Sequence, residues 1–60
     1  MFTLKIDTDN DAFQDGNRGY ELARILRNLS IDIKDLGDEQ WGAIIHDSNG
    51  ATVGKWSSEL

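Results

Sequence analysis

A short acidic segment, DTDNDAFQD, carries the side chains that are best placed to do chemistry. Four carboxylates fall within this segment, at Asp7, Asp9, Asp11 and Asp15. The next charged residue is a cation, Arg18. Carboxylates at this density repel one another. This repulsion destabilises a compact chain unless a bound ligand or a partner offsets it. Three roles are open for the segment: a metal-binding loop, a negative surface for a basic partner, or a solvated loop without a ligand.

The spacing of these oxygen ligands decides the metal role. Asp7, Asp9 and Asp11 stand at alternate positions, as the first ligands of an EF-hand calcium loop do. An EF-hand then needs glycine at its sixth position and a bidentate glutamate at its twelfth, where this chain has Ala12 and Arg18. We therefore expect no resident metal or cofactor, and weak calcium binding of another kind is a minor alternative.

Side chains suited to catalysis are scarce. The chain has no cysteine and one histidine, His46, which has Asp47 beside it but no nucleophile in the same motif. A small sheet also offers no deep pocket for a substrate. We expect no enzymatic activity, and we interpret His46 as a surface residue of a strand.

The charge balance narrows the classes of partner. The chain of 60 residues has 11 acidic and 6 basic side chains, a net charge of -5. Such a domain is repelled by nucleic acids and anionic membranes, and it attracts basic proteins or cations. The N-terminal sequence has neither a basic n-region nor a long apolar run, so we expect no signal peptide and no membrane span. A chain of this length is expected to form one small intracellular domain.

Alternating apolar residues predict a first strand over residues 2–7, directly before the acidic segment. Phe2, Leu4 and Ile6 point to one face of this strand, and polar residues point to the other. Residues 8–16 are polar and rich in turn formers, which indicates a loop. Phe13 is the large apolar residue of the loop, and we expect it to pin the loop to the core.

A helix is predicted over residues 18–36. Its apolar side chains form a stripe roughly 100° wide, made by Leu22, Ile25, Leu26, Leu29, Ile33 and Leu36. Asn17 suits the N-cap, and Gly37 suits the position after the last turn. Residues 30–33 have poor helix propensity. The apolar stripe passes through them without a change of phase, so we expect one continuous helix.

Two further strands, 41–46 and 51–56, are predicted around the turn sequence DSNG. A turn with Gly50 in the left-handed conformation sets their register. The predicted cross-strand pairs are Asp47 with Ala51, His46 with Thr52, Ile45 with Val53, Ile44 with Gly54, and Gly42 with Trp56.

The predicted architecture is an α+β fold of order β-α-β-β, in which one helix packs on one face of a three-stranded, mainly antiparallel sheet. The expected core consists of the residues that face this interface: Phe2, Leu4, Ile6, Phe13, Leu22, Ile25, Leu26, Leu29, Ile33, Leu36, Trp41, Ile45 and Val53. The other face of the sheet is open to solvent, because one helix cannot cover both faces. We expect it to carry an alternative interface for a partner or a second copy, formed by Ile44, His46 and Trp56, with Thr3 and Lys5 nearby.

The helix is expected to continue the negative surface of the loop. Its acidic side chains lie within roughly 60° of one another, at Glu21, Asp32 and Asp35. Its cations, Arg24, Arg27 and Lys34, are assigned to the opposite flank. The acidic flank joins the loop carboxylates in one ridge, made by Asp9, Asp11, Asp15, Glu21, Asp32 and Asp35. At ~1.7 Å of duplex DNA per charge, the 11 carboxylates of the chain match roughly 19 Å, or five to six base pairs.

Three segments resemble short open reading frames of phages and mobile elements: residues 8–13 (TDNDAF), 21–27 (ELARILR) and 47–56 (DSNGATVGKW). Together these segments contain 23 of the 60 residues. Among small acidic phage proteins, the chain is most similar to the anti-CRISPR inhibitors of type I systems, particularly type I-C. This resemblance implies an inhibitor that mimics DNA and blocks DNA binding by a CRISPR surveillance complex in the cytoplasm of a host bacterial cell.

Two functions are therefore carried forward. The first is an acidic DNA mimic that binds a basic, DNA-recognising protein surface, such as that of a CRISPR effector subunit, without contacting nucleic acid itself. The second is a small interaction module, a monomer or a weak homodimer, that binds a partner or itself through the open face around Trp56.

Overall fold

The structure is a computed structural model that describes residues 1–36 and 41–59. Over these ranges the chain forms strand β1 (Phe2–Ile6), the 3-10 helix η1 (Asp11–Phe13), helix α1 (Arg18–Leu36), strand β2 (Trp41–His46) and strand β3 (Thr52–Ser58). The predicted α+β fold with one helix against an antiparallel sheet is confirmed. Gly37, expected after the last turn of the helix, lies outside the described residues.

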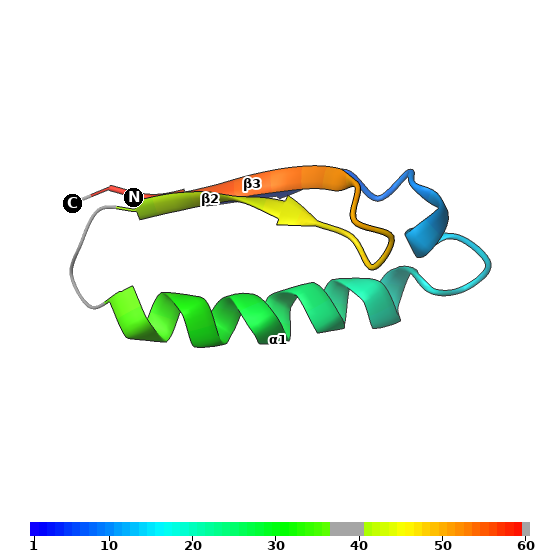
Figure 1. Cartoon of the computed structure of the whole chain (residues 1–60), viewed down its shortest axis with the longest axis horizontal. Coiled ribbons are helices and arrows are strands. Elements are labelled where there is room, and N and C mark those ends of the chain that lie inside the picture. The colour runs from blue at the N-terminus through cyan, green and yellow to red at the C-terminus, as the bar shows by residue number, and fades with distance from the viewer. Residues whose placement is uncertain (37–40, 60) are drawn as a thin grey trace.

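The strands are arranged in the order β1-β3-β2, and both neighbouring pairs are antiparallel. Helix α1 lies along one face of this sheet, and the opposite face is bare (Figure 1). The two ends of the described chain meet: the Met1 amino group donates to the Glu59 carbonyl at 2.7 Å, and the Glu59 N–H donates to the Met1 carbonyl at 3.0 Å. These bonds close the end of the sheet that lies farthest from the η1 loop (Figure 1).

Helix α1 begins and ends where the apolar period predicts, because that period marks the side that can be buried. Ile25 and Leu29 are buried on this side. The Asn17 carbonyl accepts the Glu21 N–H at 2.8 Å, as the carbonyl of an N-cap residue does. The helix continues through Ser30, whose hydroxyl donates to the Arg27 carbonyl at 2.7 Å.

The β2–β3 turn has the predicted conformation. Gly50 has a φ of 86°, and the Asp47 N–H donates to the Ala51 carbonyl at 2.9 Å. The first pair after the turn, His46 with Thr52, is also the predicted one.

Beyond that pair the predicted register is wrong. A β-bulge opposite the Ile45–His46 step leaves Val53 as an extra residue in β3, so Ile45 lies opposite Gly54. An extra residue reverses the alternation of the strand. Val53 and Trp56, which are three positions apart, therefore both face the helix, and each is only 5% exposed.

Trp56 is accordingly a core residue, and the expectation that it lies on the open face is wrong. It is paired with Leu4 of β1 and Ala43 of β2, at the centre of the sheet. The Phe2 ring stacks on it, with ring centroids 5.8 Å apart. Gly54 permits this arrangement, because a Cβ there would collide with the Lys5 carbonyl oxygen.

The buried core lies between the sheet and α1. Its buried apolar members are Phe13, Ile25, Leu29, Ile45, Val53 and Trp56, and Leu4, Ile6, Ala12, Leu22, Ile33 and Leu36 pack against them. Phe2, Leu26 and Trp41, predicted to belong to the core, are 46%, 46% and 55% exposed. A single helix is narrower than a three-stranded sheet, so residues at the margin of their contact stay partly in solvent.

Candidate functional site

The segment between β1 and α1 forms an ordered acidic surface. We define the acidic loop by its four exposed carboxylates, Asp7, Asp9, Asp11 and Asp15. Helix η1 turns the chain within this loop and buries Phe13, which is 2% exposed, against α1 and the sheet. The expectation that Phe13 pins the loop is thereby confirmed. The loop lies at the end of the molecule opposite the chain termini (Figure 1).

Local hydrogen bonds set the shape of the acidic loop. The Asp9 N–H donates to the Asp7 carboxylate at 3.0 Å, and the Gln14 side-chain amide donates to the Asp9 carbonyl at 3.1 Å. Asp15 has a φ of 58°, a left-handed conformation that aspartate tolerates better than most residues. The exposed carboxylates are thus presented from a backbone whose course is determined by its own contacts.

Asp47 connects the acidic loop to the β2–β3 turn. Its carboxylate accepts the Asn10 side-chain amide at 3.3 Å and the N–H groups of Asn49 and Ala51, each at 2.9 Å. Burial, the strongest influence, raises the pKa of Asp47, but these donors together outweigh it and hold the pKa below its usual value. With 5% of its surface exposed, Asp47 stabilises the scaffold and is not available to a partner.

Glu21 is also part of the scaffold, which corrects its place in the predicted ridge. Its side chain is 6% exposed, and one carboxylate oxygen accepts from Arg24 Nε at 2.6 Å while the other accepts the Ser48 N–H at 2.7 Å. The bond from Arg24 and then the bond from Ser48 lower the pKa of Glu21 from 4.5 to about 2. Glu21 thus ties the first turns of α1 to the β2–β3 turn and offers no free charge outside.

The remaining members of the predicted ridge fall into two groups. Asp9, Asp11 and Asp15 belong to the acidic loop, whereas Asp32 and Asp35 are exposed on the second half of α1. At ~1.5 Å per residue, Asp32 lies roughly 21 Å along the helix from its first residue. Because Glu21 is buried, no exposed carboxylate of the predicted ridge lies on the helix between these two groups.

The predicted separation of charges across α1 is also incorrect for one cation. Arg24 lines the same groove as Asn28 and Asp32, between the helix and β2. Its guanidinium reaches the His46 carbonyl at 3.4 Å. The attraction of Arg24 to Glu21 turns this cation toward the sheet, and helical angles alone did not reveal it.

Among the described residues, the exposed carboxylates form no ion pair with a cation of the same chain. Over residues 1–36 and 41–59, the ion pair between Arg24 and Glu21 is the one that meets a 4.0 Å limit. A shallow depression beside the acidic loop is lined by Asp9, Asn10, Asp11, Asp47, Asn49 and Ala51. Within the described ranges, no three side chains of the His, Asp and Glu types are placed to hold a metal ion.

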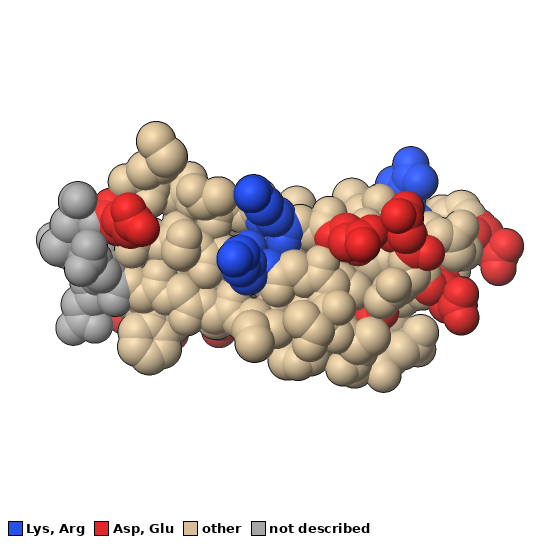
Figure 2. Space-filling model, turned by 90° about the horizontal axis from the view of Figure 1, so that it is seen from above, with Lys and Arg blue, Asp and Glu red and all other residues tan. Residues whose placement is uncertain are grey.

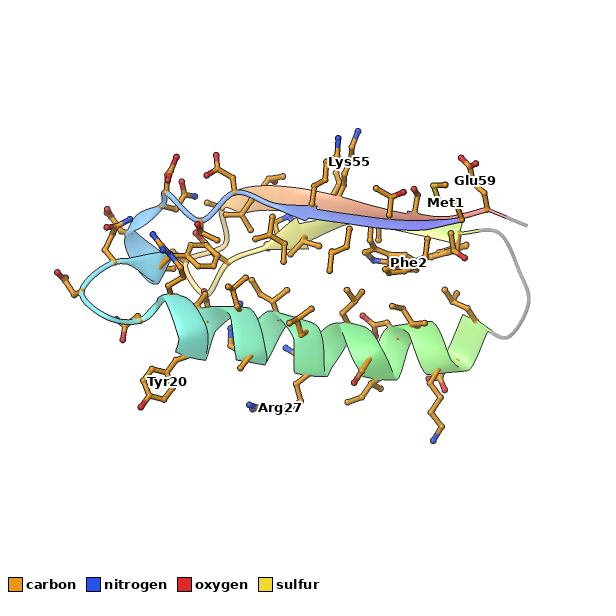
Figure 3. The ribbon with its side chains drawn as sticks, turned by 180° about the vertical axis from the view of Figure 1, so that it is seen from behind. Met1, Phe2, Tyr20, Arg27, Lys55 and Glu59 are labelled. Atoms are coloured by element: carbon orange, nitrogen blue, oxygen red, sulfur yellow. The ribbon has the colours of Figure 1, made fainter. Side chains whose placement is uncertain are left out.

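The open face of the sheet differs from the predicted one because of the bulge. Lys5, Lys55 and Ile44 lie in one row across the three strands. Figure 2 looks onto this face and shows cations near its middle and carboxylates gathered toward the loop end with basic atoms beside them, and it shows further acidic atoms at the opposite end. Lys55 points away from the helix, whereas Phe2 lies on the helix side (Figure 3). Of the alternative interface, Ile44 and His46 are exposed and Trp56 is not.

One signal in the sequence could have revealed the lysine pair. Regular alternation from Val53 places Lys55 toward the core and Trp56 toward solvent, which is the reverse of their preferences. An intervening glycine, Gly54, is the residue type that commonly accompanies a bulge. Together these three features indicated an irregular strand.

No helix among the described residues is long and apolar enough to cross a membrane. Comparisons with protein-family models, with curated proteins and with solved structures found no match to this chain.

Proposed function

We propose that the protein is a non-enzymatic inhibitor that inserts its acidic loop into a basic, DNA-binding surface of another protein. The observation that carries this proposal is the ordered group of exposed carboxylates at one end of the molecule, with no cation of the described chain within ion-pair distance. Such a group offers a partner several negative charges in a defined arrangement, as a short stretch of DNA backbone does.

The order of the loop favours binding over simple solvation. Buried Phe13 and the Asp7–Asp9 and Asp9–Gln14 bonds hold the backbone before a partner arrives. A preorganised surface loses less conformational freedom on binding than a mobile one. Arginine and lysine side chains of the partner would form charge-assisted hydrogen bonds with the carboxylates.

The class of target is taken from the resemblance of the chain to anti-CRISPR inhibitors of type I systems. A CRISPR surveillance complex reads DNA through positively charged channels, which suit an acidic ligand. The protein would then exclude DNA by occupying part of that surface. Asp32 and Asp35, on the second half of α1, would make at most a separate contact.

Reversal of two loop charges tests the proposal. Asp9→Lys and Asp11→Lys together should weaken inhibition of DNA binding by a purified type I-C surveillance complex by about tenfold or more, because two attractive contacts become repulsive. DNA binding is measured by electrophoretic mobility shift over a series of inhibitor concentrations. Both side chains are exposed and accept no hydrogen bond from the described residues, so the fold should persist.

The matched control is Asp32→Lys with Asp35→Lys, which makes the same change of net charge at the other end of α1. It should leave inhibition within about threefold of the wild type. Equal loss of inhibition in both double variants would show that net charge, not the acidic loop, is responsible. Unchanged inhibition in the loop variant would refute the proposal.

A further inference from the structure

One outer strand of the sheet has no protection in its own sequence against pairing with another strand. The order β1-β3-β2 leaves β1 and β2 as edges. Natural edge strands are commonly guarded by charged residues, proline or bulges. Strand β1 carries Lys5 next to its last residue, whereas β2, with the sequence WGAIIH, has no Lys, Arg, Asp, Glu or Pro, and the bulge lies in β3.

The free backbone groups of β2 follow from the pairing on its other side. In an antiparallel ladder, successive residues direct their N–H and C=O groups alternately toward one neighbour and the other. The Asp47 N–H bonds to β3, and the His46 carbonyl lies outward, where it meets Arg24. Gly42 and Ile44 share the outward direction of His46, and their outward groups have no partner among the described residues.

The helix places a polar row beside this edge. Arg24, Asn28 and Asp32 line the groove between α1 and β2 at intervals of one helical turn. The row spans ~12 Å, at ~1.5 Å per residue. Along β2, Gly42 and His46 are ~13 Å apart, at ~3.3 Å per residue.

The two rows run in opposite directions and share a centre. Helix α1 and β2 are antiparallel in Figure 1, and contact between Arg24 and the His46 carbonyl aligns their ends. Asn28 then lies level with Ile44, and Asp32 lies level with Gly42. Rotation by 180° about an axis through Ile44 therefore exchanges the positions of the cation and the anion in the helical row.

We propose that two copies of this chain pair along β2, antiparallel about a two-fold axis at Ile44, so that their sheets join into one. A symmetric interface requires that each patch be complementary to itself. Here Gly42 of one copy lies opposite His46 of the other, and the glycine leaves room for the imidazole. Arg24 of each copy faces Asp32 of the other copy, and the central Asn28 side chains face one another.

The dimer covers the most exposed large apolar side chain of the strand. Ile44 is 62% exposed in the single chain. At the axis it packs against Ile44 of the second copy. Lys55 and Lys5 lie outside this contact, one and two strands away from β2. Because the strands pair antiparallel, the two acidic loops lie at opposite ends of the dimer and both stay free.

Sedimentation equilibrium over a concentration series tests the pairing. The wild type should dimerise reversibly. Ile44→Lys should raise the dissociation constant about tenfold or more, because it places two cations at the axis. Thr3→Lys is the matched control: it puts a lysine on the same face but on edge strand β1, and it should leave dimerisation unchanged. Circular dichroism verifies that each variant is folded.

Two further variants make the test specific to the proposed geometry. Asp32→Arg should also weaken the dimer about tenfold, because it faces Arg24 of the second copy, whereas Asp32→Asn should have a smaller effect. The chain has no cysteine, so Ile44→Cys introduces one thiol per copy. Paired residues of neighbouring strands have Cα atoms ~5.5 Å apart, within reach of a disulfide.

Ile44→Cys should oxidise rapidly to a covalent dimer, and Thr3→Cys should do so much more slowly. The proposal is overturned if the wild type is monomeric throughout the concentration series. It is also overturned if Thr3→Lys dissociates the dimer as Ile44→Lys does, or if both cysteine variants cross-link equally, since pairing along β2 predicts a difference.

Discussion

Glu21 and Arg24 show how one pair of side chains joins distant parts of the chain. The carboxylate accepts from Arg24, three residues along the helix, and from the Ser48 N–H in the β2–β3 turn. A carboxylate with such donors is stabilised in its ionised form. The negative charge of Glu21 is therefore paired inside the molecule and is not presented to a partner.

The lowered pKa of Glu21 predicts a loss of stability in acid. The pKa of Glu21 is about 2 in the folded chain, against an ordinary value of 4.5. Ionised Glu21 therefore stabilises the fold fully above about pH 4.5. That contribution declines as the pH falls toward 2. Thermal unfolding of the wild type between pH 7 and pH 2 should show a falling midpoint in this window.

Glu21→Gln isolates this effect. The variant should be less stable than the wild type at pH 7 and should lose less stability between pH 4.5 and pH 2, because its amide does not titrate. Asp35→Asn, at an exposed position, is the control and should follow the wild-type profile. Parallel wild-type and Glu21→Gln curves throughout this window would contradict the assigned role.

At the scale of the elements, the bulge in β3 determines which tryptophan is buried. Without it, Trp56 would point to solvent and Lys55 to the helix. With it, Trp56 is 5% exposed, whereas Trp41, at the start of edge strand β2, is 55% exposed. Trp56→Ala would therefore remove a core side chain, at a cost of about 3–5 kcal/mol. A domain of this length has roughly 3–9 kcal/mol of stability in total.

Fluorescence distinguishes the two tryptophans without emptying the core. Trp41→Phe leaves Trp56 as the emitter, and its emission should be blue-shifted and weakly quenched by acrylamide. Trp56→Phe leaves Trp41, whose emission should be red-shifted and strongly quenched. The measurements belong at low protein concentration, where the β2 edge is unpaired. Similar quenching in the two variants would contradict the bulged register.

At the scale of the whole molecule, charge is distributed along its length. The molecule measures 38 × 18 × 16 Å, with the acidic loop at one end, the chain termini at the other, and cations near the middle of the open face (Figures 1 and 2). The acidic loop and the β2 edge are thus separate surfaces, and they depend on different interactions. The proposed binding through the loop depends on charge alone, whereas the proposed pairing along β2 depends on backbone hydrogen bonds and Ile44, with Arg24 and Asp32 as additional charge contacts.

Salt separates these two surfaces. Raising the ionic strength from about 0.05 M to about 0.3 M should weaken inhibition through the acidic loop by about tenfold, because exposed charges are screened. The same change should alter the dimer much less, since salt weakens the Arg24–Asp32 contacts but also the repulsion between two copies with a net charge of -5 each. Inhibition that is insensitive to salt would contradict binding through the carboxylates.

The amino-acid sequence was enough to predict the features that depend on near neighbours in the chain. The helical period defines α1, the DSNG sequence defines the β2–β3 turn, and Phe13 marks the anchor of the acidic loop. These features are readable because residues a few positions apart share a face or close a turn, whatever the rest of the chain does.

The strand order, the register beyond the turn and the exposure of each carboxylate could be learned from the three-dimensional structure alone. Trp56 is buried because an extra residue in β3 reverses its face. Glu21 is not available to a partner because its carboxylate accepts the Ser48 N–H. Both outcomes depend on which distant segments pack together. The free energy of this tertiary packing outweighs the preferences that strand alternation and helical angles express locally. The acidic segment therefore remains a surface, the helix flank does not continue it, and the free edge of β2 emerges as a second one.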